Sequence, residues 1–176
     1  GGSGADTLTG NSGINTLTGN AGNDTLDGGA GGDTLDGGAD FDTASYASAS
    51  TGVTVDMSNT ANNTGDAAGD TYVSIEKILG SNNADTLIAA AGGSNLDGGA
   101  GNDTVRGGAG ADTLAGGAGT GDTLSYSTDT TGVAVNIGAN TASGGNAAGD
   151  TISGFENVTG GTGNDTLTGT TGTNTL

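Results

Sequence analysis

Aspartate occupies most positions of a nine-residue spacing over long stretches of the chain, each time after a glycine-rich run. One series extends from residue 6 to residue 42, and a second extends from residue 85 to residue 112 before it slips by one residue at Asp122. Carboxylates and backbone carbonyls are the oxygen ligands that Ca²⁺ accepts, and a flexible glycine loop can turn its carbonyls towards an ion. The pattern therefore predicts multiple Ca²⁺ sites, one at each glycine-rich turn.

Other metals fit this donor set less well. Mg²⁺ keeps several waters and demands a tighter octahedron. Zinc and copper favour histidine and cysteine ligands, and the sequence contains neither residue. A merely solvated acidic surface would mix aspartate with glutamate, whereas glutamate occurs only at residues 76 and 156.

The element that carries each aspartate is a nine-residue repeat, for which residues 28–36 (Gly-Gly-Ala-Gly-Gly-Asp-Thr-Leu-Asp) are an example. The glycines permit positive φ and close backbone approach, so the first six residues suit a tight loop. The last three residues place one apolar side chain between two polar ones, which is the alternation of a short strand with one buried face. Two loops and two strands would make a coil of about 18 residues. Stacked coils then form two parallel sheets, with Leu8, Leu26, Leu87 and Val105 among the inward residues.

The chain also repeats over a longer period of about 80 residues. Residues 45–55 resemble residues 125–135, and residues 67–71 resemble residues 147–151. We therefore expect the chain to be part of a longer array of such units.

These two periods divide the chain into nonapeptide segments and spacers. We expect the spacers to form longer, irregular coils of the same solenoid, and the alternative is a protruding loop or a small β-subdomain. The predicted segments are a nonapeptide roll at 1–42, a spacer at 43–84, a second roll at 85–122, a second spacer at 123–159, and the start of a further nonapeptide array at 160–176.

The nonapeptides resemble the glycine-rich repeat of the repeats-in-toxin family, G-G-x-G-x-D-x-U-x with U apolar. Segments 1–9, 28–36, 98–106, 107–115 and 160–168 carry the motif. The resemblance implies an all-β fold, a parallel β-roll or β-solenoid of stacked coils. It further implies that Ca²⁺ lies between the turns of successive coils on the same side.

The same resemblance implies which residues bind the ions. Each ion would take the carboxylate at the sixth position of the repeat together with several turn carbonyls. The carboxylates at this position belong to Asp6, Asp24, Asp33, Asp42, Asp85, Asp103, Asp112, Asp122 and Asp165. The carbonyls belong to the first and third positions of the turns, for which Gly28, Ala30, Gly107 and Ala109 are examples.

Some positions depart from the motif. Asn15, Ser94 and Asn174 stand where aspartate is expected, and because their oxygens carry no charge, we expect these turns to bind Ca²⁺ weakly or not at all. In the spacers, Asp70 and Asp150 occur in a related Gly-Asp-Thr motif. We include these two aspartates as further predicted ligands.

The composition excludes several classes of function. The chain has 20 acidic residues and only two basic ones, Lys77 and Arg106, for a net charge of −18. It therefore has too little positive charge to neutralise nucleic-acid phosphates or anionic lipids. The apolar runs are too short for insertion into a bilayer. No histidine or cysteine is present to activate a nucleophile, and no G-x-S-x-G motif occurs, so we expect no enzymatic activity.

The hydrophobic residues make up 31% of the chain and the aromatic residues 3%, which is too little for the core of an ordinary globular enzyme. We therefore expect folding to depend on Ca²⁺. The expected function is that of a calcium-binding structural or spacer segment of a larger secreted or cell-surface protein, such as an adhesin, a surface-layer protein or a fibrous appendage. The family's type I export route fits this function.

Other functions are kept as alternatives. The chain would otherwise be an accessory Ca²⁺-binding module of a secreted enzyme or toxin, with a cell-surface polysaccharide as a candidate partner. The recurrent threonine before each apolar residue suggests a third function, an ice-binding solenoid. Because the open ends of a solenoid are sheet edges, end-to-end or lateral self-association is a further expectation.

Overall fold

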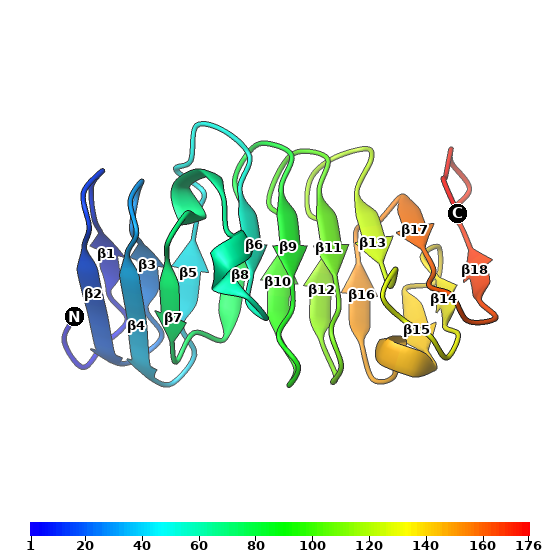
Figure 1. Ribbon diagram of the computed structural model, residues 1–176, viewed down its shortest axis with the longest axis horizontal. Coiled ribbons are helices and arrows are strands. Elements are labelled where there is room, and N and C mark those ends of the chain that lie inside the picture. The colour runs from blue at the N-terminus through cyan, green and yellow to red at the C-terminus, as the bar shows by residue number, and fades with distance from the viewer.

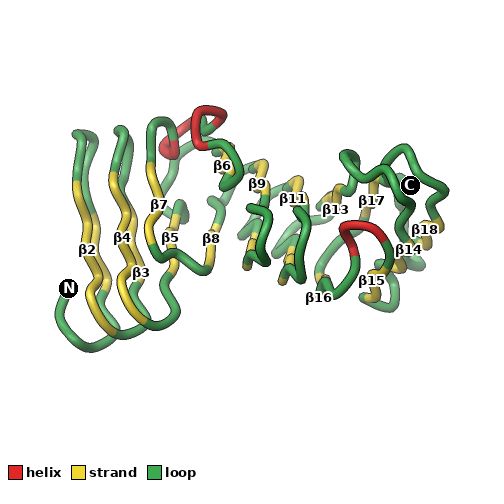
Figure 2. The backbone as a smooth tube through the Cα atoms, turned by 60° about the horizontal axis from the view of Figure 1, so that its bottom comes forward, coloured by secondary structure: helices red, strands yellow, loops and turns green.

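Short strands follow one another along the chain, and the coils that they form are stacked along one axis with the two termini at opposite ends (Figure 1). The computed structural model describes all residues from Gly1 to Leu176. The only helical segments are three single 3-10 turns, Thr60–Asn62, Gly65–Ala67 and Gly145–Ala147, which Figure 2 shows on the spacers. The fold is a parallel β-roll, and none of its helical segments has the length and apolarity needed to cross a membrane.

The strands form one long sheet, one of intermediate length and two short ones. The seven-stranded sheet has the order β1 (Thr7–Thr9), β3 (Thr25–Asp27), β5 (Thr43–Ser45), β8 (Lys77–Leu79), β10 (Asn95–Asp97), β12 (Thr113–Ala115) and β16 (Thr151–Ser153). The five-stranded sheet has the order β17 (Asn157–Thr159), β13 (Thr123–Ser125), β11 (Thr104–Arg106), β9 (Thr86–Ile88) and β6 (Thr54–Asp56). The three-stranded sheets are β2 (Thr16–Ala21), β4 (Thr34–Ala39), β7 (Thr71–Val73) and β15 (Thr141–Ser143), β14 (Ala134–Asn136), β18 (Thr166–Thr168).

Neighbouring strands pair in register, so that equivalent residues of successive coils lie side by side. All strand pairs are parallel except β14 with β15. Leu8 pairs with Leu26, and Leu87 pairs with Val105. Leu26, Leu87 and Val105 are completely buried in a cluster of 24 buried residues. Leu8 is only partly buried, because the first coil has a neighbouring coil on one side only.

Both spacers contribute strands to the sheets. In the first spacer, β6 pairs with β9, and the chain then returns so that β7 pairs with β4 and β8 pairs with β5. The second spacer repeats this path, because β14 pairs with β18, β16 pairs with β12 and β17 pairs with β13. The longer sequence period is therefore also a period of strand pairing.

Equivalent strands of the two long units lie in different sheets. β5 belongs to the seven-stranded sheet, whereas its equivalent β13 belongs to the five-stranded sheet. β7 belongs to the β2–β4–β7 sheet, whereas its equivalent β16 belongs to the seven-stranded sheet. Each nonapeptide supplies one strand, which is half of a coil, and successive half-coils lie on opposite sides of the roll. A unit with an odd number of half-coils therefore places equivalent strands of the next unit on the opposite side.

Candidate metal centre

The turns that precede the strands bring successive coils into close contact. In the turn 28–33, Gly29 and Gly31 have φ angles of 79° and 134°. A Cβ on either glycine would lie 2.8 Å from a carbonyl oxygen of the adjacent turn, that of Asn11 or that of Gly13. Glycine is required at both positions, because an L side chain is strained at these φ angles and would collide with the neighbouring backbone.

The aspartates at the sixth position lie inside this stack of turns and contact the adjacent coil. The backbone N–H of Asp24 donates to Oδ1 of Asp42 at 2.7 Å, and that of Asp85 donates to Oδ1 of Asp103 at 2.8 Å. We call such hydrogen bonds, from the backbone N–H of the residue directly before a strand to the acidic side chain directly before the paired strand of the next coil, the carboxylate ladder. They fix the spacing of the coils without using the second carboxylate oxygen.

The ladder includes every predicted carboxylate except Asp6, which accepts a hydrogen bond from Gly2 within its own turn. Asp6 belongs to the first coil, so no earlier coil supplies it with an N–H donor. The ladder acceptors are Asp24, Asp33, Asp42, Asp70, Glu76, Asp85, Asp103, Asp112, Asp122, Asp150, Glu156 and Asp165.

Five of these carboxylates keep one oxygen without any partner. Oδ2 of Asp24, Asp33, Asp42, Asp103 and Asp122 is buried and accepts no hydrogen bond. A buried, unpartnered carboxylate oxygen is costly, because it has lost its hydration and gained nothing in exchange. A bound cation would remove that cost, so these oxygens fit the Ca²⁺ ion that their chemistry favours.

In four of the five, the free oxygen lies beside the first glycine of its own turn. A Cβ on Gly19 would overlap both Oδ2 of Asp24 and the carbonyl oxygen of Gly37, which is the first residue of the next turn on that side. A Cβ on Gly98 would likewise overlap Oδ2 of Asp103. Because the glycine has no side chain, a carboxylate oxygen and a carbonyl oxygen can both lie close beside it, and these are the two kinds of ligand that Ca²⁺ takes.

Burial of several carboxylates in one row raises their pKa values. Burial raises the pKa of Asp103 to about 7; the hydrogen bond from the Asp85 N–H opposes the shift, and the charges of Asp85 and Asp122 add to it. Burial also raises the pKa values of Asp42 and Asp122. A divalent cation would therefore compete with protons for the same oxygens.

Asp70 and Asp150, the predicted ligands in the spacers, have a different environment. Oδ1 of each accepts a ladder hydrogen bond, and Oδ2 accepts one from a tyrosine hydroxyl, that of Tyr46 at 2.7 Å or that of Tyr126 at 2.6 Å. The Tyr46 hydroxyl also lies 2.5 Å from that of Tyr72. Burial raises the pKa of Asp70 to about 6. Neither spacer carboxylate has the free oxygen that the five nonapeptide aspartates offer.

Glu76 and Glu156 are members of the ladder that we did not predict. Their Oε2 atoms accept hydrogen bonds from the backbone N–H groups of Asp42 at 2.8 Å and Asp122 at 3.0 Å. Only three residues separate β7 from β8, and three separate β16 from β17, so these turns are shorter than the nonapeptide turns. The signal was present in the sequence, because the only two glutamates lie at equivalent places of the long repeat, each directly before a strand.

The remaining predicted ligands vary in their surroundings. Oδ2 of Asp112 accepts a hydrogen bond from Gly108 at 3.1 Å, and Oδ2 of Asp85 accepts one from Ser81 at 2.5 Å. Asp165 is half-buried in the last complete repeat. No group of three or more acidic side chains converges on one point. The predicted carbonyl ligands accept none of the backbone hydrogen bonds between turns, and they belong to Gly28, Ala30, Gly107 and Ala109.

Comparison with known proteins agrees with this geometry. No curated protein matches the chain. A family model, the RTX calcium-binding nonapeptide repeat, matches it several times, and between them the matches cover the nonapeptide segments and leave most of both spacers outside. The matched residues are 1–35, 9–44, 79–114, 88–121 and 150–176. The chain therefore belongs to the family of RTX calcium-binding nonapeptide repeats, whose members bind multiple Ca²⁺ ions, and it is a calcium-binding repeat module.

Proposed function

We propose that this module is a structural or spacer segment of a larger secreted or cell-surface protein, and that Ca²⁺ binding makes it fold after export. The observation that carries the proposal is the set of five buried Oδ2 atoms without a partner. In a chain of net charge −18, uncompensated carboxylates in the interior oppose folding strongly. Cations at the turns that carry these aspartates supply the missing compensation.

The proposed ligands are the sixth-position carboxylates and the carbonyls of the first and third turn positions. Asp70 and Asp150 are left out of this set, because tyrosine hydroxyls and ladder N–H groups already use both of their oxygens. The proposed carboxylate ligands are Asp6, Asp24, Asp33, Asp42, Asp85, Asp103, Asp112, Asp122 and Asp165.

The dependence on Ca²⁺ suits a protein that works outside the cell. Where free Ca²⁺ is scarce, repulsion among the carboxylates keeps the chain unfolded and able to pass through an export channel. Where Ca²⁺ is abundant, each occupied site adds roughly RT ln(1 + [L]/Kd) to the stability of the folded state, and the contributions of several sites add up. The same argument applies to an adhesin, a surface-layer protein or a fibrous appendage.

The proposal is tested by far-ultraviolet circular dichroism during chelation and calcium titration. We expect a coil spectrum in excess EGTA and a cooperative gain of strand signal as Ca²⁺ reaches the millimolar range. A protein that keeps its strand signal after exhaustive chelation would contradict the proposal.

Matched triple variants show whether the ladder carboxylates are responsible. The substitutions Asp24→Asn, Asp33→Asn and Asp42→Asn remove the charge of three carboxylates that have an unpartnered oxygen. We expect them to shift the midpoint of the calcium-induced folding transition to higher Ca²⁺ concentration. The substitutions Asp27→Asn, Asp36→Asn and Asp66→Asn remove the same charge outside the ladder. An equal shift in both triple variants would mean that general charge repulsion, rather than ion binding at the turns, controls folding.

A further inference from the structure

The first and sixth residues of a regular turn occupy neighbouring space. A Cβ on the first residue would overlap the side-chain oxygen of the sixth residue and a carbonyl oxygen of the adjacent coil. In the turn 10–15, for example, these atoms are Oδ1 of Asn15 and the carbonyl oxygen of Gly28. The first-position glycines to which this relation applies are Gly1, Gly10, Gly19, Gly37, Gly80 and Gly98.

The turn 89–94, Ala-Ala-Ala-Gly-Gly-Ser, departs from this relation at both positions. Ala89 is the only first residue of a nonapeptide turn that is not glycine, and it is 3% exposed. Ser94, the sixth residue, has a side chain that ends one atom beyond Cβ. The methyl group therefore stands at the position that a side-chain oxygen approaches in the other turns, and no carboxylate stands opposite it.

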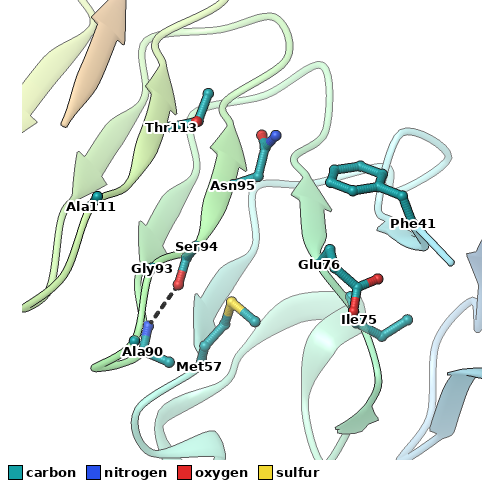
Figure 3. A pocket seen from close by; sticks show the side chains of 11 residues that line it. Phe41, Met57, Ile75, Glu76, Ala90, Gly93, Ser94, Asn95, Ala111 and Thr113 are labelled. Atoms are coloured by element: carbon teal, nitrogen blue, oxygen red, sulfur yellow. Dashed lines mark hydrogen bonds between the residues drawn. The ribbon is translucent and has the colours of Figure 1, made fainter. Parts of the chain in front are cut away.

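The serine closes this turn without a carboxylate. Its Oγ accepts a hydrogen bond from the backbone N–H of Ala90 at 3.2 Å, which Figure 3 shows on the wall of an open groove. In the adjacent turn the equivalent bond runs from Gly108 to Oδ2 of Asp112 at 3.1 Å. The Ser94 hydroxyl thus accepts the hydrogen bond of the second-position N–H, and it brings no negative charge into the turn.

The ladder is interrupted on one side of this turn. The N–H of Glu76 donates to the carbonyl oxygen of Asp42 instead of a side chain at position 94. The N–H of Ser94 still donates to Oδ1 of Asp112 at 2.7 Å. The turn therefore donates a ladder bond to the next coil, while its own sixth residue accepts none.

From these observations we infer that the turn 89–94 binds no Ca²⁺, because the Ala89 methyl group occupies the place that the carboxylate oxygen approaches in the regular turns and Ser94 supplies no charged ligand. The inference rests on the proposed function and refines it. The ion row on this side of the roll is interrupted between the short turn at Glu76 and the turn 107–112. Phe41, Met57 and Ile75 line the groove at the interruption, together with Glu76.

The test measures calcium bound per chain by equilibrium dialysis and metal analysis at saturating Ca²⁺. We expect Ser94→Asp alone to gain nothing, because the methyl group remains. The double variant Ala89→Gly/Ser94→Asp should gain about one ion per chain, since it restores both a carboxylate and the room for that carboxylate beside the first residue of the turn. Equal calcium content in the single and double variants would overturn the inference.

A reciprocal variant covers the case in which the double variant does not fold. Gly28→Ala/Asp33→Ser installs the same pair of residues in the turn 28–33, where an added Cβ would meet only side-chain atoms of Asp33, and we expect the protein to fold with Ca²⁺ but to lose about one ion. Unchanged calcium content in this variant would overturn the inference by itself.

The substitution Asn15→Asp distinguishes a failure of the inference about the turn 89–94 from a failure of the proposed function. Gly10 already leaves room for the side-chain oxygen of residue 15 in that turn, so we expect this single substitution to tighten calcium binding. If the unaltered protein binds no Ca²⁺ at all, the proposed function fails. If the unaltered protein binds Ca²⁺ and Asn15→Asp tightens binding, but Ala89→Gly/Ser94→Asp gains no ion, only the inference about the turn 89–94 fails.

Discussion

The backbone N–H of Asp103 donates a hydrogen bond to Oδ1 of Asp122 at 2.8 Å, while Oδ2 of the same Asp122 is buried without a partner. One carboxylate therefore has two separable roles. Its first oxygen joins two coils through a bond that an uncharged amide oxygen can also accept, and its second oxygen requires a cation. Substitutions that remove one role at a time distinguish cohesion between coils from ion binding.

Asp122→Asn keeps an acceptor for the Asp103 N–H and removes the charged oxygen. We expect a loss of about 2 kcal/mol in calcium-saturated stability, the scale of one interaction with a charged group. Asp122→Ala removes the ladder bond as well and should cost about 1 kcal/mol more. Urea unfolding at saturating Ca²⁺ measures both losses, with Asp36→Asn as the control outside the ladder. Identical losses for asparagine and alanine would show that the ladder bond contributes nothing.

Glu156→Asp shortens the side chain that accepts from the Asp122 N–H. The shorter carboxylate no longer reaches this donor, so we expect the buried N–H to lose its partner at a cost of about 1–3 kcal/mol. Glu156→Gln keeps the length and the acceptor, and its loss should be smaller. Thermal unfolding at saturating Ca²⁺ compares the two variants. A glutamine variant that is less stable than the aspartate variant would mean that charge matters more than reach at this position.

Tyr126→Phe removes the hydroxyl that donates to Oδ2 of Asp150. The carboxylate would stay buried with one oxygen unpartnered, so we expect a loss of about 1–3 kcal/mol in unfolding free energy. The matched control is Tyr72→Phe, which leaves the bond from Tyr46 to Asp70 in place and should cost less. Urea unfolding with Ca²⁺ present provides the measurement. Equal losses would assign the effect to packing of the aromatic rings.

Acid should replace part of the effect of calcium in the chelated protein. The folded-state pKa of Asp103 is raised to about 7 by burial, above an ordinary aspartate pKa of about 4. The folded state therefore binds the proton more strongly than the unfolded state, and stability rises as the pH falls through this interval and declines as the pH rises. In EGTA, the strand signal should be larger at about pH 5 than at about pH 8.

The control for this pH dependence is Asp103→Asn, which removes one of the titrating groups and should reduce the gain in acid. At saturating Ca²⁺ the order should reverse, because protons displace the ion from its ligands. A chelated protein with more strand signal at about pH 8 than at about pH 5 would show that these carboxylates do not oppose folding.

The nonapeptide part of the fold could be predicted from the sequence, because one local period sets both the strands and the turns. Leu26 lies between two polar residues and points inward, and Asp24 follows five residues of turn and contacts the next coil. The all-β fold class and the calcium-binding family follow from this repetition. The contacts between stacked coils follow from the same repeat, since equivalent residues of successive coils pair with one another.

The spacers could not be predicted in the same way, because their contacts join residues without a common period. Tyr46 and Asp70 are 24 residues apart and form a buried hydrogen bond, which uses one of the oxygens that we predicted as metal ligands. Glu76 entered the ladder through a shortened turn that the nine-residue spacing does not describe. Such pairings depend on the path of the chain through three dimensions.

The exchange of sheets between β5 and β13 has a consequence for how a string of these units would look from outside. In Figure 1 one of the two coiled segments of the first unit lies towards the upper edge, and the coiled segment of the second unit lies at the lower edge. The surface features of consecutive units would therefore alternate between opposite sides of the solenoid. A partner that binds one side would meet the same surface only at every other unit, so its binding sites would be spaced by about 160 residues of chain.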